Sequence, residues 1–80
     1  RENITEARRR LAEHDHYVAD FYYKRYHYLS ASYRYAALLQ EFPNLGYDEE
    51  ALCRLGVSQF HTHNYSSARD TLSRFMKQYP

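Results

Sequence analysis

Glycine, proline and cysteine are scarce in this sequence. Its 80 residues include two Gly, two Pro and one Cys, and there is no Trp. The single cysteine, Cys53, excludes an internal disulfide and a CxxC metal or redox motif. The sequence also lacks a Gly-rich phosphate loop and the GxSxG and HExxH motifs of hydrolytic enzymes. No apolar run approaches the roughly twenty residues of a transmembrane helix, so none is predicted.

A dominant charge of one sign is also missing. Eleven Lys and Arg oppose ten Asp and Glu, which leaves a formal net charge of +1 and a pI of about 8.1. Nucleic-acid-binding domains usually have a pI above about 9, so that class is disfavoured. The start, Arg1-Glu2-Asn3, has neither Met nor a signal-peptide pattern, and we expect the chain to be a fragment of a longer protein. Ten Tyr and four Phe are the one enrichment, and Tyr suits half-buried faces and interfaces.

The first half of the chain is predicted to form two helices. Neither Gly nor Pro occurs before Pro43, and Asn3 or Thr5 can cap a first helix from about residue 4. A turn is expected near His27-Tyr28. The second helix is predicted over about 29–41, because the residue before a proline disfavours helix.

The second half is predicted to form two more helices after a loop at 44–46. Asp48 is an N-cap candidate for a third helix over about 48–62, with acidic residues in its first turn. Asn64 interrupts the pattern. A fourth helix is expected to begin at Ser66 or Ser67 and to end before Pro80. Alternation with period two, the signature of a strand, is absent.

An internal repeat with a constant offset of 37 (68 − 31; 80 − 43) is the strongest feature of the sequence. The first copy carries Tyr28, Ala31, Tyr35, Leu38, Phe42 and Pro43, and the second carries Tyr65, Ala68, Leu72, Phe75, Tyr79 and Pro80. Small and large residues at such spacing are typical of tetratricopeptide repeats of about 34 residues. We therefore predict one all-α unit, a tetratricopeptide-type α-solenoid of two helical hairpins with four antiparallel helices. The repeats are placed at 12–45, with the first helix extended upstream to about 4, and at 49–80.

Packing explains the spacing. Small residues at Ala19, Ala31, Gly56 and Ala68 let helix backbones approach, and larger ones at Tyr35, Leu38, Leu72 and Phe75 fill the space beside them. Most of the Tyr-rich stretch over 17–35 is expected in the core or in packing between the repeats, with Tyr23 and Tyr33 the best candidates for exposure. Repeat arrays need about three units for stability, so two repeats are expected to be weakly stable or to self-associate.

No catalytic constellation is predicted. Two of the five histidines, His14 and His16, point to opposite sides of a helix, because two residues rotate by about 200°. Surface or half-buried histidines are the simpler interpretation, since no further ligands stand at matching spacing. Glu49-Glu50 fits a helix N-terminus, and Arg8-Arg9-Arg10 fits a solvated face. The sequence thus predicts no enzyme, no cofactor and no metal site.

A stripe on the first helix of each repeat is the candidate partner surface, because these helices line the concave side of such a solenoid. Its members, which step along one helix face, form the predicted partner stripe: Glu13, His16, Asp20, Tyr23 and Lys24, then Glu50, Cys53, Val57, Phe60 and His61. Asp20 and Lys24 have the i, i+4 spacing of an ion pair. Val57 and Phe60 would form an apolar anchor with a polar rim. The alternative is that a neighbouring segment covers them.

The segment 11–25, LAEHDHYVADFYYKR, resembles a particular family. It is similar to the BamD (ComL-like) tetratricopeptide lipoproteins of the outer-membrane β-barrel assembly machinery. Ala31, Arg34 and the Phe42-Pro43 stop continue the likeness, which covers about 8–43, whereas 48–80 matches only as a generic repeat.

The resemblance implies a non-catalytic scaffold in the periplasm, associated with the outer membrane through a lipid anchor upstream of this segment. It implies C-terminal repeats that dock the periplasmic domains of the barrel subunit, with other lipoproteins of the complex as further partners. Other tetratricopeptide adaptors are the alternative: a periplasmic envelope-division coordinator or a cytosolic co-chaperone-like module. A clamp for acidic tails would need a Lys- and Arg-lined groove, which Glu13, Asp20 and Glu50 oppose.

Overall fold

The computed structural model describes residues 4–80, and these form four helices. They are α1 (Ile4–Lys24), α2 (Tyr28–Glu41), α3 (Asp48–His61) and α4 (Tyr65–Gln78). No strand occurs within 4–80. The predicted all-α fold of two antiparallel hairpins is confirmed, and Asn3, one of the two predicted caps, lies outside the described residues.

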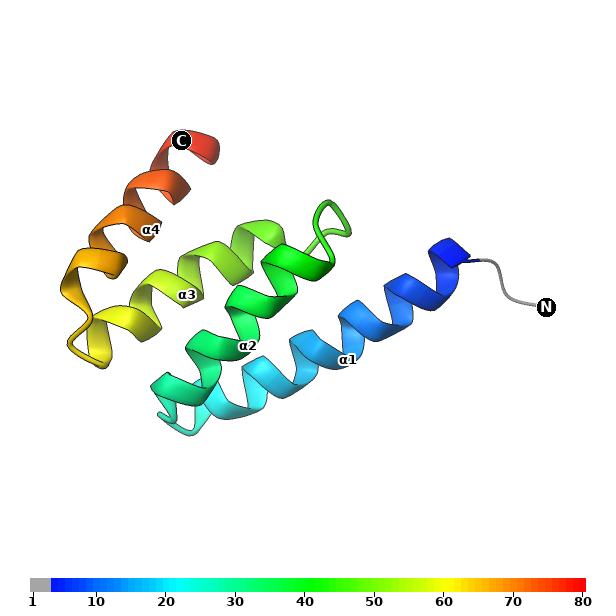
Figure 1. The fold of residues 1–80 in the computed structure, drawn as a ribbon, viewed down its shortest axis with the longest axis horizontal. Helices are drawn as coiled ribbons and strands as arrows, with labels where there is room; N and C mark the ends of the chain where they lie inside the picture. The colour runs from blue at the N-terminus through cyan, green and yellow to red at the C-terminus, as the bar shows by residue number, and fades with distance from the viewer. Residues whose placement is uncertain (1–3) are drawn as a thin grey trace.

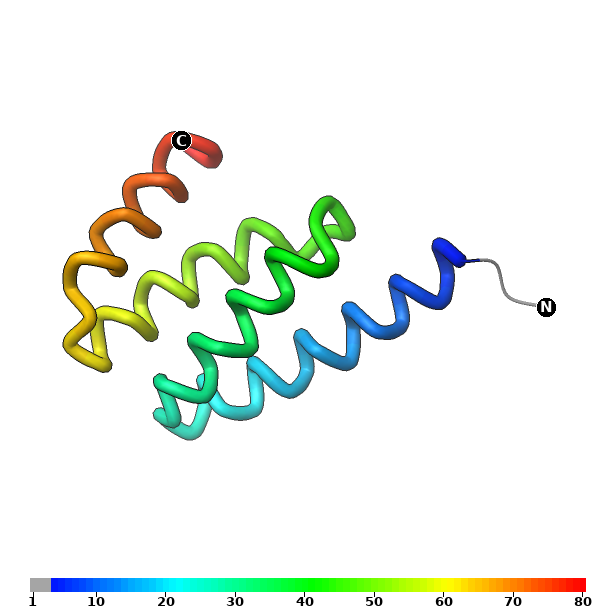
Figure 2. The backbone as a smooth tube through the Cα atoms, in the orientation of Figure 1, coloured from blue at the N-terminus to red at the C-terminus, as the bar shows by residue number. Residues whose placement is uncertain are grey.

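Each helix packs against the next one along the chain. Contacts join α1 to α2, α2 to α3 and α3 to α4, whereas α1 and α3 meet over a small area (Figure 1). The molecule measures 45 × 28 × 15 Å. Figure 2 shows the backbone reversing direction at each connection, with α1 and α4 at opposite ends of the row. The two hairpins obey the repeat: Tyr28 and Glu41 of α2 correspond to Tyr65 and Gln78 of α4 at an offset of 37 (65 − 28; 78 − 41).

The turns inside the two hairpins have the same geometry. Tyr26 and His63 both adopt the left-handed conformation, with φ of 63° and 66°. The next residue then donates its amide back across the helix end: His27 N–H to the Tyr22 carbonyl in one turn, and Asn64 N–H to the corresponding carbonyl in the other, each at 2.9 Å. This six-to-one bond is the Schellman motif, which ends a helix. The left-handed position of that motif, here Tyr26 or His63, usually holds Gly.

The loop between the hairpins is built around Gly46 and Asp48. Gly46 has a φ of +97°, a conformation that other residues adopt only with strain. The Asp48 carboxylate accepts the Asn44 amide at 3.0 and 3.2 Å. Asp48 thus stabilises the loop through its side chain. It is the first residue of α3 and not the predicted N-cap, because the N-cap is Tyr47, which makes no side-chain cap bond. The start of α4 is likewise Tyr65 rather than Ser66 or Ser67.

The core consists of small residues surrounding a few large ones. Tyr35 and Leu38 of α2 are buried at 0% and 1% exposure. The residues that cluster with them are Ala12, Ala19, Ala31, Phe42, Ala51 and Leu55. Most of the Tyr-rich stretch lies in the core or packs between the repeats, as predicted: Tyr35 is fully buried, and Tyr22, Tyr23 and Tyr28 are half-buried. Tyr33 is exposed as predicted, whereas Tyr23 is half-buried.

Gly56 sets the closest approach of α3 and α4. A Cβ atom placed on it would lie 2.5 Å from Leu72 Cδ2 and 2.6 Å from Leu72 Cγ. Real Cβ contacts are longer than this, so any larger residue must push Leu72 away. The same place in the first hairpin holds Ala19, which confirms that these small positions serve close packing.

We expect Gly56→Val to lower the free energy of unfolding by about 1–3 kcal/mol, because overpacking forces neighbouring side chains off their rotamers. Urea denaturation followed by circular dichroism measures the effect. Adding Leu72→Ala should cost less in the Gly56→Val background than in the parent chain, since it removes the clashing atoms. A Gly56→Val chain as stable as the parent would contradict this packing.

Candidate functional site

An ionic junction joins the first three helices. Asp20 of α1 and Arg54 of α3 form an ion pair, and their side chains are 18% and 25% exposed. The Tyr35 hydroxyl of α2 donates to Asp20 Oδ1 at 3.1 Å. Lys24 Nζ lies 3.2 Å from the other carboxylate oxygen, which confirms the predicted i, i+4 pair. Asp20 is thus satisfied by groups from three helices.

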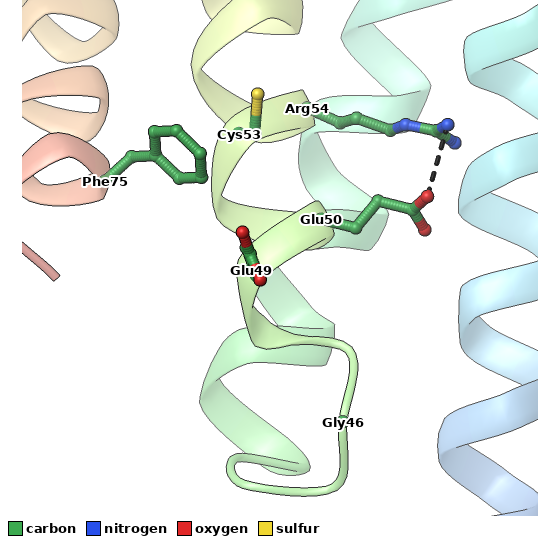
Figure 3. A pocket seen from close by; sticks show the side chains of 6 residues that line it. All are labelled: Gly46, Glu49, Glu50, Cys53, Arg54 and Phe75. Carbon is green, nitrogen blue, oxygen red and sulfur yellow. Dashed lines mark ion pairs between the residues drawn. The ribbon is translucent and has the colours of Figure 1, made fainter. Parts of the chain in front are cut away.

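The junction extends along α3 through Glu50. Arg54 Nη2 lies 3.2 Å from Glu50 Oε2, and Figure 3 shows both side chains directed from α3 toward α1. Glu50 Oε1 in turn pairs with His16 Nε2 of α1. The His16 ring stacks on Tyr47, with 4.8 Å between centroids and 27° between planes. Each of α1 and α3 therefore contributes one acidic group and one basic or imidazole group to this row of contacts.

Aromatic rings surround these charges. The Arg54 guanidinium lies over the Tyr23 ring at 4.9 Å from its centroid, a cation–π contact. Tyr23 meets Tyr35 edge to face at 6.0 Å. At the other end of α3, His61 stacks on Tyr28 with centroids 4.2 Å apart and planes at 15°. Tyr23 and Tyr35 therefore line the Arg54 side of the junction.

Burial raises the pKa of two tyrosines in the junction. Desolvation raises the pKa of the Tyr35 hydroxyl well above its ordinary value of 10.0, and the nearby Glu50 carboxylate and Tyr23 hydroxyl add to the effect. Desolvation also raises the pKa of Tyr23, with smaller contributions from Tyr28, Cys53 and Glu50. Both hydroxyls are therefore kept protonated, and Tyr35 acts as a donor to Asp20.

His16, Asp20 and Glu50 present ligand atoms within 4.8 Å of one another, a set of donors suited to a metal ion. Arg54, however, pairs with both carboxylates. Its guanidinium supplies the positive charge that a cation would otherwise bring, and a metal would have to displace it. The arrangement favours a structural ion-pair network, and the absence of a metal site stays a prediction.

The α1 half of the predicted partner stripe is largely engaged within the chain. His16, Asp20 and Tyr23 are half-buried in the junction. Glu13 and Lys24 are exposed at its edges. His16, Asp20 and Tyr23 contact α3, so the structure brings these members of the stripe together with Glu50 and Arg54 from the other repeat.

The residues of the α3 half of the predicted partner stripe lie on two sides of that helix. Glu50 and His61 turn toward the first hairpin and make the contacts described above. Cys53 and Val57 are half-buried, and Phe60 is 53% exposed. Cys53 lines an open pocket of about 400 Å³ with Phe75, which projects from α4 toward α3 (Figure 3). Among the four helices of residues 4–80, α3 contacts α4 and the first hairpin.

Two members of the junction are missing from the predicted stripe. Arg54 follows Glu50 by four residues, so helical periodicity could have placed it beside that carboxylate. The sequence pattern predicts only a packing role for Tyr35. The hydrogen bond of its hydroxyl to Asp20 cannot be predicted from the spacing of apolar residues. A partner for Asp20 from 34 positions away is visible only once α1 and α3 are side by side.

One protein-family model matches this chain. The model of the YfiO family, described as outer membrane lipoprotein, matches residues 1–59. The chain belongs to this family. The match covers most of the chain and includes the whole ionic junction, whereas α4 lies beyond it. No curated protein and no solved structure matches the chain.

Membership confirms the resemblance to BamD-type repeat lipoproteins. YfiO proteins are non-catalytic lipoproteins associated with the outer membrane. No helix within residues 4–80 has the length and apolar character needed to span a bilayer. Protein–protein interaction in an outer-membrane complex is thus the function to which the family points.

We expect the Asp20–Arg54 pair to stabilise the fold. Asp20→Ala and Arg54→Ala should each lower the free energy of unfolding by about 1–3 kcal/mol, because each removes one of the partners of a half-buried charge. The double variant should reveal a coupling of about 1–2 kcal/mol in a urea-unfolding cycle.

The matched control is the pair Arg69–Asp70, whose side chains are 77% and 75% exposed at 3.7 Å. Its coupling should stay below about 0.5 kcal/mol, as for other exposed pairs. Equal coupling for the two pairs would show that the junction is a surface contact without a structural role.

The raised pKa of Tyr35 predicts a loss of stability in alkali. Above about pH 10 the unfolded chain ionises this hydroxyl while the folded chain keeps it protonated, so the free energy of unfolding falls as the pH rises. Tyr35→Phe should make this fall shallower by up to about 1.4 kcal/mol per pH unit, at a cost of about 1 kcal/mol near pH 7 for the lost hydrogen bond. Urea unfolding between pH 9 and 11.5 measures both, and Tyr33→Phe, at an exposed position, should change neither.

Proposed function

We propose that this chain is a non-catalytic scaffold of the outer-membrane β-barrel assembly complex and docks the periplasmic domains of the barrel subunit. The observation that carries the proposal is the YfiO family match over residues 1–59, together with the repeat fold it covers. Contacts with the other lipoproteins of that complex are part of the same proposal, as is a periplasmic location at the outer membrane.

The chemistry of the site supports a binding role. Asp20, Glu50 and His16 are the groups that could act in acid–base catalysis. Asp20 forms an ion pair with Arg54, and the Glu50 carboxylate makes a hydrogen-bond contact with the His16 ring nitrogen. Arg54 is committed to two carboxylates and one aromatic ring. These contacts hold α1 against α3, which suits a structural role in a scaffold. The stripe then offers two kinds of surface: polar edges at Glu13 and Lys24, and the apolar residues of α3.

Phe60 is the sharpest residue for testing the partner surface. It is 53% exposed on the concave stripe, and an aromatic side chain in such a place is the kind of anchor that dominates interface energies. Its matched control is Tyr33, an aromatic residue that is 68% exposed on α2 and outside the stripe.

We expect Phe60→Glu to weaken binding of the purified periplasmic domains of the barrel subunit at least tenfold, because it places a charge where an apolar anchor is needed. Surface plasmon resonance with the immobilised chain measures the dissociation constant, and far-UV circular dichroism checks that the helices persist. Tyr33→Glu should change the constant less than threefold. Binding that survives Phe60→Glu and fails with Tyr33→Glu would place the partner on the convex side.

A further inference from the structure

The turn of the first hairpin and the start of α2 carry an exposed surface that is both apolar and basic. Tyr26 in the turn is 78% exposed, and Leu29 and Tyr33 of α2 are 55% and 68% exposed. The spacing of four residues places Leu29 and Tyr33 on one face of α2, and Tyr26 lies in the turn directly before this face. Lys24 and Arg25, which are also exposed, complete the surface at the turn. We name these five residues the hairpin tip.

The second hairpin is polar at the same positions. The offset of 37 carries Lys24, Arg25, Tyr26, Leu29 and Tyr33 to His61, Thr62, His63, Ser66 and Asp70. The fold therefore accepts polar side chains where the first hairpin has two tyrosines and a leucine. Apolar side chains that gather on a surface without serving the fold indicate an interaction site.

Neighbouring repeats do not cover these positions. The first hairpin has α3 and α4 after it, and its tip stays exposed. The second hairpin has α1 and α2 before it, and the equivalent residues His63, Ser66 and Asp70 are exposed as well. A repeat on either side of a hairpin thus leaves this surface open, so its exposure does not depend on which repeats flank it.

The charge around the hairpin tip is of one sign. No Asp or Glu occurs between residues 21 and 40, a stretch that holds Lys24, Arg25 and Arg34. Asp20, the carboxylate just before this stretch, is half-buried in the ionic junction. The chain as a whole has a formal net charge of only +1, so this local excess of cations is a property of the first hairpin. Its charge is complementary to an anionic surface.

The shape of the hairpin tip favours a lipid surface over a protein groove. None of the main cavities within residues 4–80 is lined by Tyr26, Leu29 or Tyr33, so these side chains project outward. Protein interfaces depend on closely matched shapes. A bilayer surface instead accepts projecting side chains, with Tyr rings at the level of the headgroups and Lys and Arg reaching the phosphates. The family is one of outer membrane lipoproteins, which work beside such a surface.

We propose that the hairpin tip binds the surface of an anionic phospholipid bilayer. Tyr26, Leu29 and Tyr33 enter the headgroup region, and Lys24 and Arg25 pair with lipid phosphates. The contact is peripheral, because no helix within residues 4–80 is suited to span a bilayer. It goes beyond the proposed docking of the barrel subunit, since it fixes how the scaffold is oriented on the membrane.

Vesicle binding by the 80-residue chain tests the proposal. The probes are vesicles of equal parts phosphatidylglycerol and phosphatidylethanolamine, and uncharged vesicles of phosphatidylcholine. Sedimentation measures the partition coefficient, which we expect to be at least tenfold higher for the anionic vesicles. The double variant Leu29→Ser, Tyr33→Asn leaves the net charge unchanged and should lower partition into anionic vesicles at least tenfold. Arg25→Gln should lower it about fivefold, because it removes one cation near the surface.

The matched control is the double variant Leu11→Ser, Met76→Asn. These residues are 57% and 62% exposed on α1 and α4, outside the hairpin tip. The control should change partition less than threefold, and far-UV circular dichroism checks that both double variants keep their helices. Equal losses for the two double variants would show unspecific adsorption and overturn the proposal, as would a parent chain that does not bind anionic vesicles.

A single tryptophan reports which surface meets the lipid. The chain has no Trp, so the fluorescence of Tyr33→Trp comes from the hairpin tip alone. On anionic vesicles its emission should shift to shorter wavelength and be quenched by phospholipids brominated in the acyl chain. Asp70→Trp, at the equivalent position of the second hairpin, should show neither effect. Binding that leaves Tyr33→Trp unquenched, or quenching that is equal at the two positions, would overturn the proposal.

Capture of the barrel subunit's periplasmic domains, measured in parallel, separates this contact from the proposed scaffold function. Loss of vesicle binding with unchanged capture in Leu29→Ser, Tyr33→Asn supports a membrane contact. Loss of capture with unchanged vesicle binding would show that the hairpin tip is a protein surface and overturn the membrane contact. A parent chain that captures these domains but ignores anionic vesicles leaves the scaffold function standing and removes the membrane contact.

Discussion

The ion pair of Asp20 and Arg54 joins the two hairpins where α1 meets α3, beside the packing of α2 against α3. Neighbouring helices pack through apolar faces, but α1 and α3 meet over a small area, and their contact there is charged. The Tyr35 hydroxyl adds a third helix to the same carboxylate. Because a half-buried charge is costly when unmatched, this arrangement favours one register of α3 on α1 over its neighbours.

The junction also divides the predicted partner stripe into two parts that differ in their contacts. On α1, His16 and Asp20 of the stripe contact α3, so these polar groups contribute to the packing of the helices. On α3 the equivalent positions, Cys53, Val57 and Phe60, carry no charge, and Phe60 is 53% exposed within residues 4–80.

The connections illustrate how far local sequence rules extend. Gly46 marked its loop correctly because glycine is favoured at a positive φ. The two hairpin turns use the same left-handed geometry with Tyr26 and His63, where no glycine announces it. Packing of the flanking helices imposes that geometry against the preference of these residues, and Asp48 similarly serves the loop rather than the cap.

The sequence by itself determined the helices, their order, the 37-residue repeat and the family, because these follow from local periodicity and from residues close together in the chain. It also determined the small positions, of which Gly56 is the clearest. Tertiary structure alone decided that Arg54 reaches Asp20 and that Tyr35 completes the junction. It alone decided which side of α3 is covered, since burial depends on the neighbour that a helix meets and not on its own pattern.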